Sequence, residues 1–266
     1  LVRSRRWILV GDRQQLPPFQ DEASRDADFL KKYDLDRDEI KQTLFDRLFE
    51  ALPEANRKML TIQHRMVAAI GDLIGECFYD GKLESARQDI DSELSTVLPK
   101  PVTWLTTTKL RDNREKPANS SFNNPCEANA IVQLLEELNE MADVFDKNYS
   151  IAVLTGYAAQ LKLLEKRLAR ESKKWQNLTV ECNTVDAFQG READIAVYSV
   201  TRSNKKGEIG FLRATERLNV ALSRGKVGLV IVGDHHFCRT SGKHPLSKVL
   251  DYIESHRQNC ILKEAN

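Results

Sequence analysis

Short apolar runs alternate with amphipathic segments along the second half of the chain. The pattern predicts strands at 150–157, 179–185, 194–202 and 226–234, and helices at 126–145, 158–175, 214–225 and 244–258. Strands that are buried on both faces read as continuous apolar runs, and helices between successive strands cover both faces of a parallel sheet. We therefore expect an α/β domain with a mostly parallel sheet and helices on both faces.

The first half of the chain is less regular. An apolar run from Trp7 to Val10 stops at the turn GDRQQLPP, which predicts a buried strand that ends at a polar turn. Apolar positions between Leu44 and Leu52 share one helical face, and Pro53 ends that helix. Further elements are expected as strands at 58–66 and 102–108, and as a helix at 67–81.

Polar residues follow several of these apolar runs. We expect the clusters Gly11–Asp12, Gln63–Arg65, Thr155–Tyr157 and Thr184–Gly190 at the carboxyl ends of strands. Ligands of open α/β sheets bind beyond the carboxyl ends of the strands. The clusters therefore predict a ligand site along that edge of the sheet.

Composition narrows the class of protein without naming its ligand. The chain has 266 residues and a net charge of +1, so no global positive field indicates nucleic acid, although a local basic groove is compatible with this sum. The five cysteines never form a CxxC pair, which argues against a disulfide framework or a zinc site and favours a reducing, cytoplasmic compartment. No apolar run is long enough to span a membrane and no signal peptide opens the chain, while the missing initiator Met indicates a fragment.

Several residues carry candidate chemistry, and each also has an ordinary structural explanation. Gln15 can sense a phosphate oxygen or lie in a turn that caps a strand. Arg65 can present a planar fork to phosphate or form a surface salt bridge, and Arg224 can bind phosphate or complement a helix end. Gly190 permits close backbone approach but also suits a common turn, and His64 is more typical of a structural than of a catalytic histidine.

Two motifs of a complete nucleotide-hydrolysing site are missing from the sequence. The phosphate-binding pattern GxxxxGK(S/T) does not occur, and no acidic pair closes an apolar strand where Mg²⁺ ligation would be expected. The nearest approach, residues 75–83, has Leu83 where a hydroxyl is needed. The chain has the arginines of a nucleotide machine without its phosphate cradle.

Taken in order, these segments resemble superfamily 1 helicases, most closely the branch of the nonsense-mediated-decay RNA helicase and its DNA helicase relatives. VGDRQQLPP is similar to motif III, QHRM to motif IV, and TGYAAQ to the TPYxxQ segment of that branch. TVDAFQGREADIAVYSVTRSN resembles motif V, and GFLRATERLNVALSRGKVGLVIVGD resembles motif VI with the following strand. The resemblance implies a RecA-like P-loop NTPase fold.

The resemblance also implies a role for each matching residue. Gln15 would contact the γ-phosphate of ATP, and Arg65 and Arg224 would be arginine fingers that stabilise the charge developing during hydrolysis. Glu192 and Gly190 would lie at the nucleotide edge of the cleft.

Two further residues would touch nucleic acid, and two positions depart from the family pattern. Thr155 and Thr184 would contact the phosphate backbone of a single strand, which suits sequence-independent movement. His64 replaces the usual Tyr that lies against the adenine base, which puts base affinity in question. Gly156 replaces the usual Pro, which loosens the turn after Thr155.

The resemblance finally divides the chain. Residues 1–20 would be the last strand and motif III turn of a first RecA-like domain, 21–57 a helical connection, and 58–262 the second RecA-like domain. ATP and Mg²⁺ would be held mainly by the missing first domain. We expect a monomeric ATP-dependent helicase or translocase that binds single-stranded nucleic acid, with DNA favoured over RNA, and this chain alone is expected to be inactive.

A second hypothesis belongs to a different class. The chain could be a non-catalytic nucleic-acid or protein binding module that kept the helicase fold and lost the motor. The intact Gln15, Arg65, Glu192 and Arg224 argue against this alternative, since drift would have erased some of them.

Overall fold

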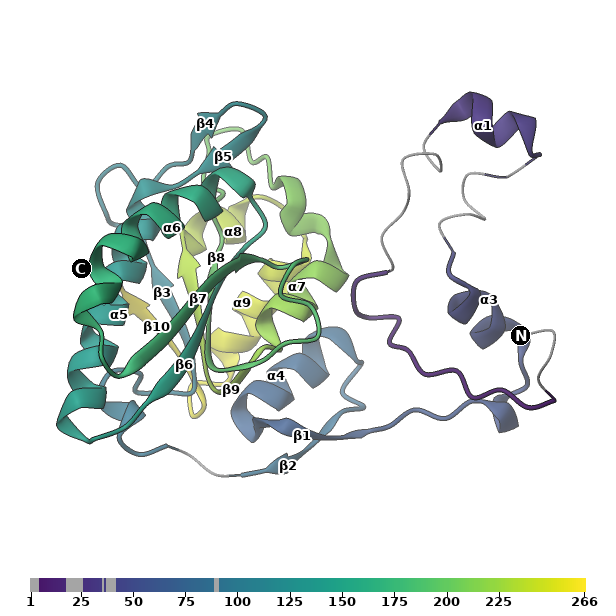
Figure 1. Cartoon of the computed structure of the whole chain (residues 1–266), viewed down its shortest axis with the longest axis horizontal. Helices are drawn as coiled ribbons and strands as arrows, with labels where there is room; N and C mark the ends of the chain where they lie inside the picture. The colour runs from purple at the N-terminus through teal and green to yellow at the C-terminus, as the bar shows by residue number, and fades with distance from the viewer. Residues whose placement is uncertain (1–4, 18–25, 35, 37–41, 89–90) are drawn as a thin grey trace. The chain divides into compact units, whose positions relative to one another are not determined.

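The computed structural model describes residues 5–17, 26–34, 36, 42–88 and 91–266 (Figure 1). The chain divides into two compact units, Leu1–Leu60 and Thr61–Asn266. The larger unit begins three residues after position 58, where the second RecA-like domain is predicted to start.

A six-stranded sheet forms the centre of the larger unit. The strands lie in the order β10-β3-β9-β8-β6-β7, and every neighbouring pair is parallel. Their bounds are β3 Val102–Thr106, β6 Tyr149–Thr155, β7 Leu178–Thr184, β8 Ala193–Ser199, β9 Gly225–Gly233 and β10 Cys260–Glu264. The predicted parallel α/β sheet is confirmed.

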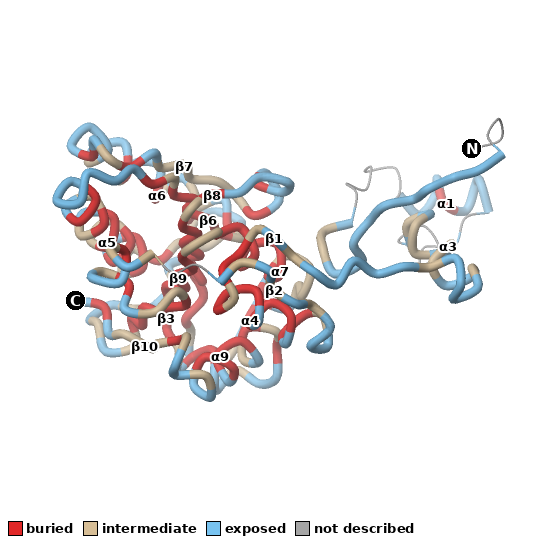
Figure 2. The backbone as a smooth tube through the Cα atoms, turned by 90° about the horizontal axis from the view of Figure 1, so that it is seen from below, coloured by how far each residue is buried: buried red, intermediate tan, exposed pale blue. Residues whose placement is uncertain are grey.

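Helices cover both faces of this sheet, with α5 and α6 on one face and α4, α7 and α9 on the other (Figures 1 and 2). The bounds are α4 Ala68–Phe78, α5 Pro125–Val144, α6 Ala158–Glu171, α7 Thr215–Leu222, α8 His235–Thr240 and α9 Pro245–Ser255. Successive side chains of a strand point to opposite faces. Accordingly, Ile151 and Val153 join the core with α5 and α6, while the alternate residues Ala152 and Leu154 are buried on the other face.

Local signals explain where two of these helices begin or end. The side chain of Asn124 accepts hydrogen bonds from the N–H groups of Cys126 and Glu127, and Pro125 occupies the first turn of α5. At the end of α4, Gly81 has φ +70° and donates its N–H to the carbonyl of Gly75 at 3.0 Å. This left-handed conformation suits glycine, as the predicted helix end requires.

Strand β10 is the main element that the pattern did not predict. It pairs in parallel with β3 and carries the main sheet to Glu264, beyond residue 262, where the second RecA-like domain is predicted to end. Its sequence, CILKE, mixes apolar and charged residues because it forms an edge of the sheet.

Four short strands lie outside the main sheet. β1 (Ile62–Val67) pairs in parallel with β2 (Glu84–Arg87), and β4 (Lys116–Ala118) forms a hairpin with β5 (Ser121–Asn123). Residues 62–66 of the predicted strand at 58–66 are confirmed as part of β1, which belongs to a separate two-stranded sheet, whereas residues 58–61 are not in a strand.

The described residues of the smaller unit include two short helices, α1 (Ala27–Lys32) and α3 (Leu44–Ala51). Thr43 and Asp46 form a reciprocal capping box at the start of α3, and Leu52 caps its end directly before Pro53. The predicted helix and its stop are confirmed. Part of the predicted connection at 21–57 lies outside the described residues.

The predicted strand from Trp7 to Val10 is not formed in the described part of this unit. Residues 6–10 have no strand pairing, and Ile8 is 92% exposed. A strand needs a neighbour to satisfy its backbone N–H and C=O groups, and no described segment supplies one here.

Candidate functional site

The predicted site residues of the larger unit lie at opposite edges of the main sheet. Glu192 comes just before β8 and Arg224 just before β9, at what we call the amino edge. Thr155 and Thr184 are the last residues of β6 and β7, at the carboxyl edge. Parallel strands place all their beginnings on one side, so the two groups cannot share one ligand contact.

The expectation that every polar cluster follows a strand end is wrong for Gln63–Arg65. These residues lie inside β1, where register shifts between Gln63 and Val67. The Gln63 amide donates to the carbonyl of Met66 and accepts from its N–H, both at 2.8 Å. Gln63 therefore stabilises the irregular backbone of β1 between Gln63 and Met66, the segment that carries His64 and Arg65.

The amino edge brings Arg65 and Glu192 together. Nε of Arg65 lies 2.9 Å from Oε2 of Glu192, and Nη1 of Arg65 donates to the carbonyl of Ser223 at 3.4 Å. Lys226 lies 3.5 Å from Glu192 and 3.6 Å from Asp194. The Arg65 and Glu192 side chains are 35% and 45% exposed, so solvent screens their attraction.

Arg224 follows Ser223 and is buried beneath this edge, with 1% of its surface exposed. Its Nε donates to the carbonyl of Val220 at 2.7 Å, its Nη2 to Oγ of Ser223 at 2.8 Å, and its Nη1 to the carbonyl of Arg191 at 3.2 Å. A guanidinium at the end of α7 satisfies helix carbonyls and offsets their partial negative charge. Arg224 therefore stabilises the end of α7, as its structural explanation requires. Its guanidinium also lies beside Ser223, whose carbonyl accepts from Arg65.

Gly190 and His64 lie at exposed positions. Gly190 has φ +81°, a conformation that other residues rarely adopt, and a side chain there would meet nothing within 4 Å. The turn thus demands glycine for its backbone and not for lack of space. His64 is exposed in β1, between Gln63 and Arg65.

The two threonines of the carboxyl edge differ in access. Thr184 is half-buried, and its hydroxyl accepts from the N–H of Ala187 at 3.3 Å. Thr155 is fully buried, and its hydroxyl lies 3.1 Å from that of Thr201 and accepts from the N–H of Tyr157 at 3.3 Å. Thr155 therefore positions the turn, and its direct contact with nucleic acid stays a prediction that its burial disfavours.

A buried carboxylate behind this edge was missed by sequence reasoning. Oε2 of Glu127 accepts from Oγ of Ser199 at 2.6 Å and from the N–H of Thr201 at 2.7 Å. Burial raises the pKa of Glu127 to about 8. Thr201 has φ +70°, which is unusual for a β-branched residue, so Glu127 holds a strained backbone in place.

The signal that could have found this network is the Gln of TGYAAQ. Gln160 is fully buried, donates to Oγ of Ser199 at 2.9 Å, and accepts from the N–H of Asn124 at 2.7 Å. Its side chain joins β8 to the start of α5. The segment therefore positions the carboxyl edge through a residue that itself faces the core.

A second network fixes the loop after β8. Arg202 and Glu115 form an ion pair at 2.9 Å with both side chains buried, and the N–H of Ser203 also donates to Glu115 at 2.7 Å. The Ser203 hydroxyl donates to Asp234, which also accepts from Thr108 at 2.7 Å. These contacts make the carboxyl edge a rigid frame.

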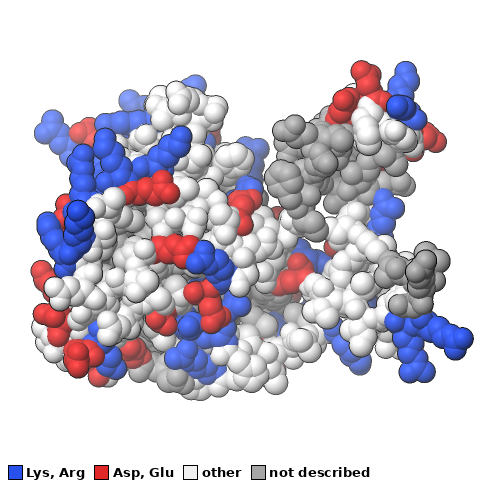
Figure 3. All heavy atoms as spheres, viewed as in Figure 1, with Lys and Arg blue, Asp and Glu red and all other residues white. Residues whose placement is uncertain are grey.

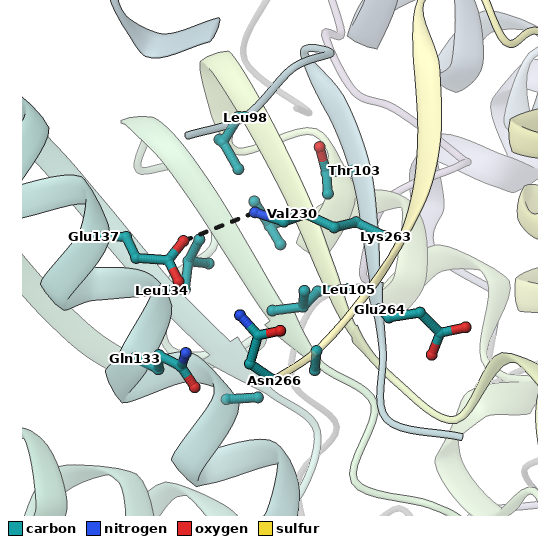
Figure 4. Close-up of a pocket in the computed structure, with 12 residues that line it drawn as sticks. Leu98, Thr103, Leu105, Gln133, Leu134, Glu137, Val230, Lys263, Glu264 and Asn266 are labelled. Carbon is teal, nitrogen blue, oxygen red and sulfur yellow. Dashed lines mark ion pairs between the residues drawn. The ribbon is translucent and has the colours of Figure 1, made fainter. Parts of the chain in front are cut away.

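A hollow between α5 and strands β3 and β10 lies apart from the candidate residues (Figure 4). Aliphatic side chains such as Leu98 and Leu105 line it, and an ion pair between Glu137 and Lys263 spans it at 3.7 Å. None of the predicted site residues lines this hollow.

In the described ranges, no three His, Cys, Asp or Glu side chains are grouped so that they could hold a metal ion. The described helices are all too short or too polar to cross a bilayer.

Comparison with known proteins agrees with the motifs. A family model described as an AAA domain matches residues 40–236. An uncharacterised ATP-dependent helicase of Methanocaldococcus jannaschii is 29% identical over 99% of this chain and 38% of its own length. Regulator of nonsense transcripts 1 of Dictyostelium discoideum is 30% identical over 92% of this chain and 18% of its own length.

A human relative carries both a helicase and a nuclease in its name. The DNA replication ATP-dependent helicase/nuclease is 32% identical over 97% of this chain and 25% of its own length. This chain thus spans well under half the length of these relatives. It belongs to the superfamily 1 helicases, in the branch of the nonsense-mediated-decay helicase, and corresponds to their C-terminal RecA-like motor domain.

Proposed function

We propose that this chain is the second motor domain of an ATP-dependent helicase or translocase, with its amino edge facing the nucleotide. The observation that carries the proposal is that Arg65 and Arg224 both donate to Ser223, while Arg65 also pairs with Glu192. Two guanidinium groups next to one residue are a suitable arrangement for a terminal phosphate, whose charge spreads over several oxygens during transfer.

Arg65 is the arginine that a phosphate can reach with little rearrangement. It is partly exposed and its ion pair with Glu192 is open to solvent, so exchanging the carboxylate for a phosphate oxygen costs little. Glu192 is then left with Lys226, which already lies 3.5 Å away. Arg65 can therefore exchange Glu192 for a phosphate while Glu192 stays paired with Lys226.

Arg224 needs a larger change. It must give up hydrogen bonds to the carbonyls of Val220 and Arg191 before it reaches a phosphate. Nucleotide closure of the cleft is the event that we expect to release it, because closing steps complete catalytic sites in many enzymes. Arg224 would therefore act in turnover only when it releases the carbonyls at the end of α7.

Gln15 belongs to the smaller unit, where Asp12 orients it. Nε2 of Gln15 donates to Oδ2 of Asp12 at 2.8 Å, and the N–H of Gln15 donates to the Asp12 carbonyl at 3.2 Å. Arg13 is tied to α3 by ion pairs with Asp46 at 2.9 Å and Glu50 at 2.7 Å. This ordered turn supports a role for the Gln15 amide as sensor of the γ-phosphate.

The carboxyl edge is the side that we propose for single-stranded nucleic acid. Thr184 is half-buried and offers a hydroxyl to a phosphate backbone, and the turns after β6 and β8 hold the surrounding edge in one conformation through their own N–H bonds to Thr155, Glu127 and Glu115. We favour DNA over RNA because the chain is compact. The human and the Dictyostelium relatives are named for DNA replication and for nonsense transcripts, so the names favour neither nucleic acid.

A cytoplasmic location and a monomeric motor complete the proposal. All five cysteines are unpaired, and Cys77, Cys238 and Cys260 are buried, which suits a reducing compartment. Mg²⁺ and most of the ATP contacts are assigned to a first motor domain with its own phosphate loop.

ATP hydrolysis stimulated by a single strand tests the proposal. We expect no turnover by the 266-residue chain and clear turnover when it is joined to a first motor domain that carries a phosphate loop. Turnover by the chain alone would contradict the assignment of the cradle. Nucleic-acid binding without turnover in the joined protein would favour the alternative, a binding module that lost the motor.

A further inference from the structure

We propose that the outer face of α6 binds the phosphate backbone of a nucleic-acid duplex next to the motor; the inference rests on the proposed function. Lys162, Lys166 and Arg170 are exposed and spaced four residues apart, so they line one face of the helix over about 12 Å. Lys173 follows in the exposed turn at the helix end. We call these four residues the α6 stripe.

The stripe has no internal partner for its charge. Within the described residues, none of its four side chains forms an ion pair or a side-chain hydrogen bond. Of the acidic residues on the helix, Glu165 lies one turn from Lys162 but forms no ion pair with it there, and Glu171 pairs with Lys174 at 2.5 Å. The stripe thus carries positive charge that no ion pair among the described residues holds, on a chain whose net charge is only +1.

The opposite face of α6 explains why the stripe is fixed in direction. Gln160, Leu164 and Leu168 are buried against the sheet, so the helix cannot rotate its cations away from solvent. Figure 3 shows Lys and Arg side chains concentrated over the region where α6 lies in Figure 1. A fixed row of cations loses less conformational freedom on binding than cations on a mobile loop.

The position of α6 connects the stripe to the carboxyl edge. The helix begins at Ala158, three residues after Thr155 ends β6, and Lys162 lies in its second turn. Nucleic acid that meets the motor at the carboxyl edge can therefore continue along α6. The stripe extends the proposed contact surface beyond the single strand.

Two features favour a duplex over a single strand as the occupant. Proteins that bind single strands combine basic grooves with aromatic side chains on which bases stack. Helix α6, with the sequence AAQLKLLEKRLARE, has no aromatic residue, so it offers only backbone contacts. A duplex hides its bases and presents closely spaced phosphates, which a straight row of cations can neutralise.

Fluorescence anisotropy with the 266-residue chain tests the inference, using a blunt duplex and a single strand of equal length between about 50 and 200 mM salt. The test variant combines K162Q, K166Q, R170Q and K173Q. We expect its duplex affinity to fall about tenfold or more and its salt slope to lose about three to four units, while single-strand affinity stays nearly constant. Thermal unfolding confirms that the variant is folded.

The matched control carries the same change of charge on exposed cations elsewhere, as K82Q, K109Q, K243Q and R257Q. Equal losses in the two variants would overturn the inference, because they would indicate a general charge effect. An equal loss for duplex and single strand would also overturn it, as would displacement of the duplex by polyglutamate at equal charge, which would indicate an acidic protein partner. Failure of the proposed function would appear separately, as no ATP turnover, or turnover that a single strand does not stimulate, when this chain is joined to a first motor domain that carries a phosphate loop.

Discussion

The two edges of the main sheet use similar residues in different surroundings. At the amino edge, Arg65 and Glu192 pair while 35% and 45% of their side chains are exposed. At the carboxyl edge, the side chains of Arg202 and Glu115 pair at 4% and 7% exposure, and Glu127 is fully buried. An exposed pair exchanges partners at little cost, whereas a buried one is costly to break.

This difference indicates a division of labour. Under the proposed function, the amino edge rearranges when a nucleotide binds, and the carboxyl edge holds its turns in one conformation. A helicase motor of this kind would need both properties, because ion pairs must exchange at the amino edge while the contacts with nucleic acid at the carboxyl edge stay fixed. Substitutions at both edges test this difference.

The largest effect is expected for Arg224 in a protein that also contains the first motor domain. Arg224→Ala should lower ATP turnover by about a thousandfold or more, because an arginine at the transferring phosphate contributes that much. Nucleotide affinity, measured with a fluorescent ATP analogue, should change only a few-fold. Arg224→Lys keeps the charge and loses the planar fork, so it should also be nearly inactive, and turnover near wild type in either variant would remove Arg224 from the mechanism.

Arg65 separates catalysis from stability. Arg65→Ala should lower turnover by about a hundredfold or more but cost less than about 1 kcal/mol of unfolding free energy, because the pair with Glu192 is partly exposed. Glu192→Gln is the matched control, since it removes the same ion pair and keeps the arginine. If both variants lose turnover equally, the ion pair matters and Arg65 has no direct role at the phosphate.

Glu127 tests the rigid frame through pH. Its pKa is raised from 4.5 to about 8, so the folded state holds a proton that the unfolded state releases above about pH 4.5. The stabilisation is complete below the unfolded pKa and is lost as pH rises through 8. Unfolding by urea should therefore show stability falling by about 2 kcal/mol between about pH 6.5 and 8.5.

The control for this pH dependence is an exposed glutamate. Glu127→Gln should flatten the pH profile, whereas Glu165→Gln should leave it unchanged. A wild-type stability that is constant over this range would mean that the hydrogen bonds from Ser199 and Thr201 keep Glu127 ionised.

The smallest effects should separate the two threonines. Thr184→Val should weaken single-strand binding several-fold, since one hydrogen bond contributes about 1 kcal/mol. Thr155→Val should instead cost about 1–2 kcal/mol of stability, because it leaves the Tyr157 N–H without its partner and leaves the buried Thr201 hydroxyl with only its 3.5 Å bond to the Ser199 carbonyl. Should Thr155→Val stay fully stable and weaken binding more than Thr184→Val, Thr155 would be a direct contact after all.

The sequence predicted the parallel sheet because its central strands are buried on both faces. Segments such as IAVLT and GLVIVG are apolar throughout, and that pattern depends only on burial. Edge strand β10 escaped prediction because only Cys260 of its five residues is fully buried. The prediction of a strand from Trp7 to Val10 was wrong because the run is apolar but has no strand to pair with in the described residues.

The sequence could identify which residues form the candidate site, but it could not predict their burial, hydrogen bonds or pKa. Motif order identified Arg65, Glu192 and Arg224, and the structure brings them to one edge. Burial of Arg224 and the raised pKa of Glu127 depend on contacts between segments far apart in the chain, which no local pattern encodes. Glu127 in particular reads as an ordinary acidic residue in the first turn of a helix.

The central claim is that the amino edge stabilises the charge that develops on the phosphate. Its most direct test compares the affinity for ADP with aluminium fluoride, which mimics the transition state, and for a non-hydrolysable ATP analogue. The wild-type protein with both motor domains should prefer the transition-state mimic by about a hundredfold or more, and R65A/R224A should lose that preference. A double variant that keeps the wild-type preference would contradict the account.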